Sequence, residues 1–213
     1  MKIYLFIYVF LLLTVFEVKA QKNWEFKKEK EQIKVYLKDV EGSKLKAFKG
    51  ECDIKAPISN CIALIQDIPS LADWMPNTSF AKLLSNSADS LLVYYSVSEA
   101  PWPLSPRDGI YQYVFQYNKS EELLEVNIKL EANKLPEEKD KIRIRVGGGR
   151  WLLKKIDDFS TKVIFEFHAD PAGDIPSWLA NSVVVDTPID TLKNMKNLVN
   201  TAKYTNQHFS FLN

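Results

Sequence analysis

Apolar and polar residues alternate along much of the chain with a period of two, the pattern of half-buried β-strands. Residues 33–38 and 48–54 show it first, and it returns in seven later runs, at about 80–84, 90–97, 109–117, 123–130, 141–146, 150–156 and 161–168. Short turn-rich segments such as 118–120 and 157–160 join these runs. The pattern therefore predicts hairpins and an antiparallel sheet of about seven to nine strands.

Helical periodicity interrupts the alternation early in the chain and again near its end. In the segment 57–68, isoleucine and cysteine residues lie three and four positions apart, and a second short helical segment follows and ends at Pro76. From Pro176 to about Tyr204 an amphipathic stripe predicts a long helix with one wide apolar face. Pro188 lies inside this stretch, so it is either a kinked helix or two helical segments that meet there.

These elements together predict an α+β fold, with a curved antiparallel sheet wrapped around the long C-terminal helix. The helix alone cannot fill the concave side of such a large sheet, so an internal hydrophobic tunnel is expected. Three glycines at 147–149 separate two of the predicted strands. They indicate a bulge or tight turn rather than a phosphate-binding loop, because no helix start follows them.

The first twenty residues are typical of a secretory signal peptide. Lys2 precedes an apolar run over 3–16, and small or apolar residues stand three and one positions before a predicted cleavage site at Gln21. The apolar run is shorter than the roughly 17–25 residues that span a bilayer. We therefore expect an exported protein, periplasmic or secreted, with a single domain over 21–204 and a flexible C-terminal tail over 205–213.

Charge and cysteine content narrow the classes of function. Without residues 1–20 the chain keeps 26 basic and 26 acidic residues. A net charge near zero argues against a nucleic-acid partner, and no polybasic cluster indicates anchoring to an anionic membrane. Cys52 lies in a predicted strand and Cys61 in the following helix, so we expect two buried free thiols rather than a disulfide, although an oxidising compartment would permit one.

Two motifs suggest a family. Residues 101–108 read PWPLSPRD and resemble the "PWP…RD" signature of START (steroidogenic acute regulatory protein-related lipid transfer) domains, and residues 170–181 read DPAGDIPSWLAN, which is similar to that family's "DPxGxIPxWLxN" sequence before the last helix. The order of elements agrees from about 24 to 204. The resemblance implies a bacterial exported member with a helix-grip fold and a tunnel for one molecule. Because START domains and more distant relatives bind sterols, phospholipids, ceramides or polyketide intermediates, the resemblance does not identify the ligand.

Apolar residues on the strand faces that turn toward the last helix form the predicted tunnel wall. Each of them alone would also suit an ordinary core, so the prediction concerns the collective surplus of large apolar side chains on a concave sheet. The predicted lining consists of Tyr111, Tyr113, Phe115, Val126, Ile128, Ile144, Val146, Val163, Phe165, Phe167, Val184, Ile189, Leu192 and Met195.

The two motifs also contribute candidate gate and polar residues. Trp102 lies between two prolines, whose fixed φ angles stiffen the loop. It is either a gate that makes transient contact with a membrane or a plug at the end of the core, and Trp178 is the second gate candidate. Arg107 and Asp108 are expected to form a structural polar pair, with ligand recognition as the alternative.

The sequence favours a carrier without a cofactor or metal over an enzyme. It contains two histidines, and it has no nucleophile elbow, no metal-ligand spacing and no glycine-rich loop that opens a helix. The alternative is a cyclase or hydratase that uses His168 and Glu166 as acid and base. These two residues, with Arg143 and Arg145, have the opposite parity to the apolar residues of their strands and are expected on the convex face, whereas Tyr94 is a further candidate for orienting a ligand.

Overall fold

The computed structural model describes residues 23–87, 90–173 and 175–212, except for the side chains of residues 177, 178, 180 and 181. The predicted signal peptide lies outside the described residues. The elements in chain order are β1 (Glu25–Lys30), β2 (Ile33–Lys38), β3 (Ala47–Ile54), α1 (Ile58–Gln66), η1 (Ile68–Ser70), α2 (Leu71–Trp74), β4 (Thr78–Ser87), β5 (Leu91–Ser98), β6 (Arg107–Asn118), β7 (Leu123–Leu130), β8 (Ile142–Arg143), β9 (Val146–Asp157), β10 (Ser160–Asp170), α3 (Ser177–Leu198) and η2 (Ser210–Leu212).

The described strands form one ten-stranded sheet in the order β1-β2-β3-β10-β9-β7-β6-β5-β4, with β8 paired to β6. The neighbours along this path are antiparallel, and only the two-residue pairing of β8 with β6 is parallel. The α+β prediction is confirmed, with one strand more than expected. The additional strand is β1, whose sequence EFKKEK is exposed along its whole length and lacks the alternation that marks the other strands.

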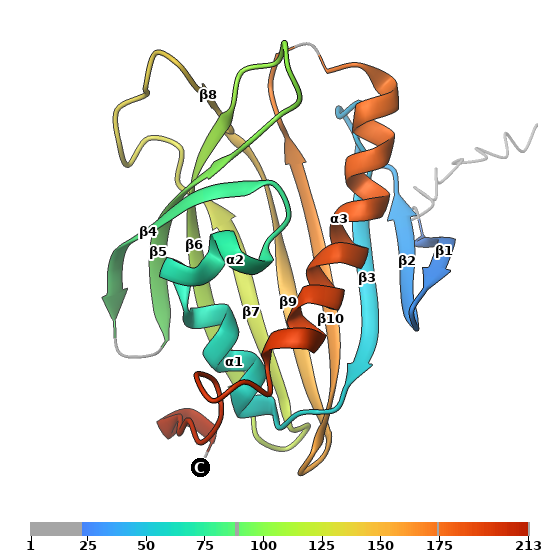
Figure 1. The fold of residues 1–213 in the computed structure, drawn as a ribbon, viewed down its shortest axis with the longest axis vertical. Helices are drawn as coiled ribbons and strands as arrows, with labels where there is room; N and C mark the ends of the chain where they lie inside the picture. The colour runs from blue at the N-terminus through green and yellow to red at the C-terminus, as the bar shows by residue number, and fades with distance from the viewer. Residues whose placement is uncertain (1–22, 88–89, 174, 213) are drawn as a thin grey trace, which may run out of the picture.

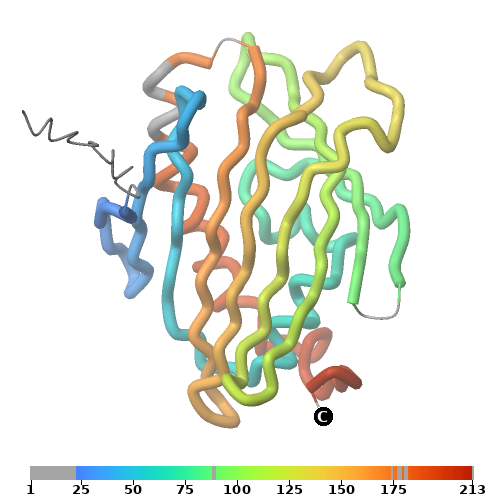
Figure 2. The backbone as a smooth tube through the Cα atoms, turned by 180° about the vertical axis from the view of Figure 1, so that it is seen from behind, coloured from blue at the N-terminus to red at the C-terminus, as the bar shows by residue number. Residues whose placement is uncertain are grey.

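Figure 1 shows how the sheet curves around α3, while α1 and α2 cover a neighbouring part of the same concave face. Seen from behind in Figure 2, the convex face of the sheet carries no helix from the described residues. The strands therefore have one face toward the helices and one face toward solvent, which explains their period-two pattern. Within the described residues, no helix is long and apolar enough to cross a membrane.

α3 is a single helix that contains Pro188, so the alternative of two segments is not what the chain adopts. The helix ends at Leu198, before the predicted Tyr204. It crosses β3 very closely at Gly50, where a Cβ atom would lie 2.8 Å from Cβ of Pro188 and 2.9 Å from Cδ1 of Leu192. A glycine is required here because any side chain would push the helix away from the sheet.

The three glycines lie inside β9 rather than in a separate turn, so this part of the prediction was wrong. They pair with β10 over the register Gly147↔Ala169 to Gly149↔Phe167. A Cβ atom at Gly149 would lie 2.0 Å from the carbonyl oxygen of Glu166. The backbones approach so closely that a side chain cannot fit, which is the physical reason for glycine in a strand.

The core is centred on stacked aromatic rings between the sheet and the helices. Trp151 stacks on Phe165 with ring centroids 3.9 Å apart and planes 5° apart, and Trp74 of α2 lies 6.1 Å from Trp151. All three side chains are buried. Truncating one such ring to alanine typically costs about 3–5 kcal/mol, so this stack fixes the helices on the sheet.

The segment 205–212, which the sequence predicts to be a flexible tail, places two aromatic side chains against the domain. Phe209 is buried in the core, and the ring centroid of Phe211 lies 6.4 Å from that of Tyr117 on β6. Just before this segment, the hydroxyl of Tyr204 donates a hydrogen bond of 2.9 Å to Asp67. The favourable free energy of removing these two aromatic side chains from water offsets the conformational entropy that is lost when this short segment is ordered.

The cysteine prediction is confirmed: Cys52 and Cys61 are both buried and free. Burial raises the pKa of Cys52 to about 11 and that of Cys61 to about 12, because the low-polarity surroundings disfavour the thiolate. Both thiols therefore stay protonated at neutral pH and act as small apolar side chains.

Candidate ligand-binding cavity

A cavity of about 440 Å³ lies between the concave face of the sheet and α3. Its walls are predominantly apolar and come from β5, β6, β7, β10 and α3, with loops at its rim. Small-molecule sites in proteins typically measure roughly 300–1,000 Å³ and have mainly apolar walls with a few polar groups. The cavity therefore fits one small hydrophobic or amphipathic molecule.

The predicted lining residues fall into three groups. Seven of them line the cavity: Tyr111, Tyr113, Ile128, Ile144, Phe165, Phe167 and Val184. Another six are buried and pack within the core without reaching the cavity: Phe115, Val126, Val163, Ile189, Leu192 and Met195. Val146 is 62% exposed, and its prediction as a lining residue was wrong. It is the first residue of β9 and has the parity of Arg150 and Lys154, opposite to the buried Trp151 and Leu153, so it belongs to the outer face.

Three tyrosines make a polar spot in the apolar wall. The hydroxyl of Tyr94 donates a 2.9 Å hydrogen bond to the hydroxyl of Tyr113, and the ring of Tyr94 stacks on Tyr111 at 5.2 Å. Burial raises the pKa of each of the three hydroxyls, because the phenolate form is disfavoured in the apolar surroundings. The cluster therefore presents neutral hydroxyl groups, which can exchange hydrogen bonds with a ligand.

Several lining residues were missed from the sequence. Ser96 and Ser98 of β5 share the face of Tyr94, and their period-two spacing from Tyr94 could have placed them on the cavity side. Others lie on loops or helices, where no strand parity applies: Leu45, Leu71, Met75, Ile175 and Leu179.

Arg107 lines the cavity and is only 5% exposed. Its Nη1 donates to the carbonyl oxygen of Ser105 at 2.7 Å, and Nε and Nη2 reach the carbonyl oxygens of Pro171 and Ala172 at 3.4 Å each. Burial lowers the pKa of the guanidinium. Arg107 does not pair with Asp108 as predicted, because successive residues of a strand point to opposite faces of the sheet.

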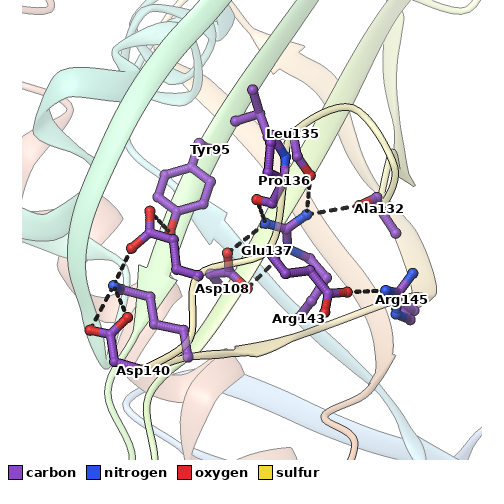
Figure 3. A network of polar contacts seen from close by, with 11 residues as sticks. Tyr95, Asp108, Ala132, Leu135, Pro136, Glu137, Asp140, Arg143 and Arg145 are labelled. Carbon is purple, nitrogen blue, oxygen red and sulfur yellow. Dashed lines mark hydrogen bonds and ion pairs between the residues drawn. The ribbon is translucent and has the colours of Figure 1, made fainter.

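Asp108 has a different partner on the outer face, shown in Figure 3. Its two carboxylate oxygens accept hydrogen bonds from Nε and Nη2 of Arg143 at 3.0 and 2.8 Å. The same guanidinium donates to the carbonyl oxygens of Ala132, Leu135 and Pro136 in the β7–β8 connection. The structural role that the sequence predicted thus applies to Asp108, together with Arg143, which anchors this long connection on the sheet.

Loops at one end of the molecule surround the mouth of the cavity. In Figure 1 the β5–β6 connection and the start of α3 meet at this end. Trp102 in the β5–β6 connection is 93% exposed, so it does not plug the core. Together with Pro101, Ile175 and Leu179 it borders a shallow groove beside the mouth. The side chain of Trp178 lies outside the described residues.

The proposed acid–base pair is not assembled. Glu166 lies on the outer face, as expected, and its carboxylate accepts a 2.9 Å hydrogen bond from Nε of Arg150. His168 instead lines the cavity rim, where its Nε2 lies 2.9 Å from the hydroxyl oxygen of Ser43. Strand parity did not predict this position, because the loop that carries Ser43 and Leu45 reaches the imidazole where the β3–β10 pairing ends, while β10 itself stays paired with β9. Burial lowers the pKa of His168.

A curved antiparallel sheet, a long C-terminal helix across its concave face and a cavity between them define the helix-grip class of ligand-binding domains. The START domain family model matches residues 17–205. An uncharacterised protein of Pseudomonas aeruginosa is 34% identical over 175 residues, which is 82% of this chain and 86% of that protein. The chain therefore belongs to the START domain family.

Solved structures agree with this assignment. A STAR-related lipid transfer protein from Xanthomonas axonopodis is 36% identical and has a TM-score of 0.76, covering 83% of this chain and 98% of that structure. Human StAR-related lipid transfer protein 5 has a TM-score of 0.72 at 16% identity, covering 85% of this chain and 88% of that structure. At that identity the second match shows a shared fold alone.

Proposed function

We propose that the protein binds one lipid or sterol-like molecule in the cavity and carries it without chemical change. The observation that supports this most directly is the cavity itself, enclosed by the sheet and α3 and lined mainly by apolar side chains. Removing apolar ligand surface from water contributes roughly 25 cal/mol per Å², so burying about 200 Å² would contribute about 5 kcal/mol. This contribution requires no charged contact, although the entropy lost on association offsets part of it.

The similarity to the Xanthomonas STAR-related lipid transfer protein supports a carrier. The polar side chains near the cavity do not favour the cyclase or hydratase alternative: Glu166 is engaged by Arg150 on the outer face, and His168 contacts Ser43. General acid–base catalysis requires the titratable group to reach the reacting atom within hydrogen-bond distance. No second group positioned with His168 supports such a step in the part of the chain that the structure describes.

Export and membrane contact belong to the same proposal. The leader-like residues 1–20 support delivery to the periplasm or the medium. Trp102 is an exposed aromatic on a proline-flanked loop beside the cavity mouth, and tryptophan is enriched at membrane–water interfaces. We propose that the Trp102 loop touches the membrane while the ligand enters or leaves, with Trp178 as a second gate residue.

A cavity-blocking substitution tests the binding site. Ser96→Trp places a large ring into the cavity, whereas Ser85→Trp adds the same ring at an exposed position of β4. The proposal predicts that the wild-type protein and Ser85→Trp bind a fluorescent sterol or fatty-acid analogue, while Ser96→Trp binds it at least tenfold more weakly with a comparable urea midpoint. Equal binding by all three, or no binding by the wild type to any analogue, would refute the proposed function.

The gate is tested separately. Replacing Trp102 by alanine should slow lipid uptake from vesicles and leave the unfolding midpoint unchanged, because the side chain has almost no contact with the rest of the protein. Stopped-flow transfer of a fluorescent lipid measures this rate. Uptake at the wild-type rate would show that Trp102 is not part of the gate.

A further inference from the structure

Two buried arginines, one on each face of the sheet, differ in their hydrogen-bond and ion-pair partners. Arg143 is 4% exposed and has the carboxylate of Asp108 in a bidentate pair as well as three carbonyl oxygens. Arg107 is 5% exposed and contacts only carbonyl oxygens, two of them at 3.4 Å. The outer guanidinium therefore has a full negative counter-charge, whereas the cavity-facing one has carbonyl dipoles alone.

A buried charge without a counter-ion is costly, and proteins usually pair it. No carboxylate of the described residues forms an ion pair with Arg107 within 4 Å. Three acidic residues do line the cavity, namely Glu99, Asp186 and Asp190, but they are exposed at its rim. Among the described residues, the guanidinium of Arg107 therefore has no acidic partner, and the cavity that it lines is predominantly apolar.

The surroundings of Arg107 suit an amphipathic molecule. Its neighbour on the same strand face is Gly109, followed by Tyr111, whose ring folds back so far that a Cβ atom at Gly109 would lie 2.7 Å from it. The apolar wall formed by Tyr111, Phe165 and Ile128 belongs to the same cavity. A charged group held at Arg107 would therefore have an apolar tail along this wall.

The start of α3 adds to the positive potential at this end. Ile175 and Leu179, on either side of the first helical residue, line the same cavity as Arg107. The helix begins after Pro176 with no side-chain cap and no acidic residue in its first turn. A helix of this length carries partial positive charge on the N–H groups of its first turn, which favours a nearby anion.

We propose that Arg107 is the headgroup subsite of the cavity and that the carried molecule has an anionic group, a carboxylate or phosphate monoester, at one end of an apolar tail. This inference rests on the proposed function and names the chemical class of its ligand. The anion accepts charge-assisted hydrogen bonds from Nε and Nη2, whose present contacts with Pro171 and Ala172 are long and easily exchanged. Both carbonyls belong to the connection between β10 and α3.

Paired ligands test the proposal in the full-length mature protein. Oleate and oleyl alcohol share a tail and differ in charge, so their dissociation constants are compared by titration at pH 8, below the critical micelle concentration, with inorganic phosphate as a competitor. Arg107→Gln removes the charge, Arg107→Lys retains it, and Arg145→Gln removes an exposed guanidinium of the outer face as a matched control. Circular dichroism and urea melting establish that each variant is folded.

The wild type should bind oleate at least tenfold more tightly than oleyl alcohol. Arg107→Gln should weaken the binding of oleate on the order of tenfold to a hundredfold and leave the affinity for oleyl alcohol within about twofold of the wild type. Arg145→Gln should change neither affinity. If Arg107→Gln does not fold, two other results test the proposal. The wild type should still prefer oleate over oleyl alcohol, and Arg107→Lys should bind oleate with intermediate affinity.

Equal affinity of the wild type for oleate and oleyl alcohol would overturn the anionic headgroup and leave the carrier function standing, as would equal weakening of both ligands by Arg107→Gln. Displacement of oleate by millimolar inorganic phosphate would show a site for small free anions rather than for a lipid headgroup. Binding of neither ligand, nor of any fluorescent lipid analogue, would overturn the proposed function together with this inference.

Discussion

The buried ion pair between Asp108 and Arg143 sets how firmly the β7–β8 connection is held over the sheet. The perturbation is Asp108→Asn, which preserves shape and removes the charge. Both side chains are only 1% exposed, and the pair is bidentate. Removing one partner of such a pair leaves a buried charge uncompensated and costs about 3–5 kcal/mol.

An exposed ion pair of the same connection supplies the control. Arg145 and Glu137 are paired with side chains 54% and 50% exposed, so Glu137→Gln should cost no more than ~1 kcal/mol. The double variant Asp108→Leu with Arg143→Met should be more stable than Asp108→Leu alone, because it removes the orphaned guanidinium as well. Because Arg143→Met also removes three hydrogen bonds to backbone carbonyl oxygens, the double variant should recover only part of the lost stability.

The assay is equilibrium unfolding in urea, followed by tryptophan fluorescence and extrapolated to water. For a domain of this size a loss of 3–5 kcal/mol corresponds to a drop in melting temperature of roughly 6–20 °C. A free energy of unfolding for Asp108→Asn within 1 kcal/mol of the wild type, or indistinguishable from Glu137→Gln, would refute the reasoning that burial decides the strength of these pairs.

Two further predictions concern the helix crossing and pH. Gly50→Val should lower the free energy of unfolding by at least about 1–3 kcal/mol in urea titrations, because its Cβ would overlap Pro188 and Leu192, while Gly42→Ala on an open turn serves as the milder comparison. The lowered pKa of His168 means that the unfolded chain binds a proton more readily, so stability should fall as pH drops below about 6.5, and His168→Gln should reduce this fall. Identical pH profiles for the wild type and His168→Gln would contradict the second prediction.

Strand parity explains what the sequence could predict. The period-two rule places Tyr111, Tyr113 and Phe165 on the helix-facing side, and the structure confirms this. The same rule, applied to Arg107, puts it on the face of Tyr111 and would have separated it from Asp108. The polar pair was instead predicted from adjacency in the sequence, which in a strand means opposite faces.

Other features could not follow from local pattern. Whether an inward residue lines the cavity or fills the core depends on where α3 crosses the sheet, and that crossing is fixed by the close approach at Gly50. This is why Leu192 and Met195 are core residues rather than cavity residues. The contact of His168 with Ser43 joins residues 125 positions apart in the chain, a non-local property that no run of residues encodes.

The proposed function requires that the cavity holds one hydrophobic molecule. Its most direct test is native mass spectrometry of the protein expressed with its leader and purified without detergent, followed by organic extraction of the bound material. We expect a population with a single bound lipid per chain, which is recovered in the extract and is lost in Ser96→Trp. Repeated recovery of the apo mass alone, with no lipid in the extract and no binding of added lipids, would contradict it.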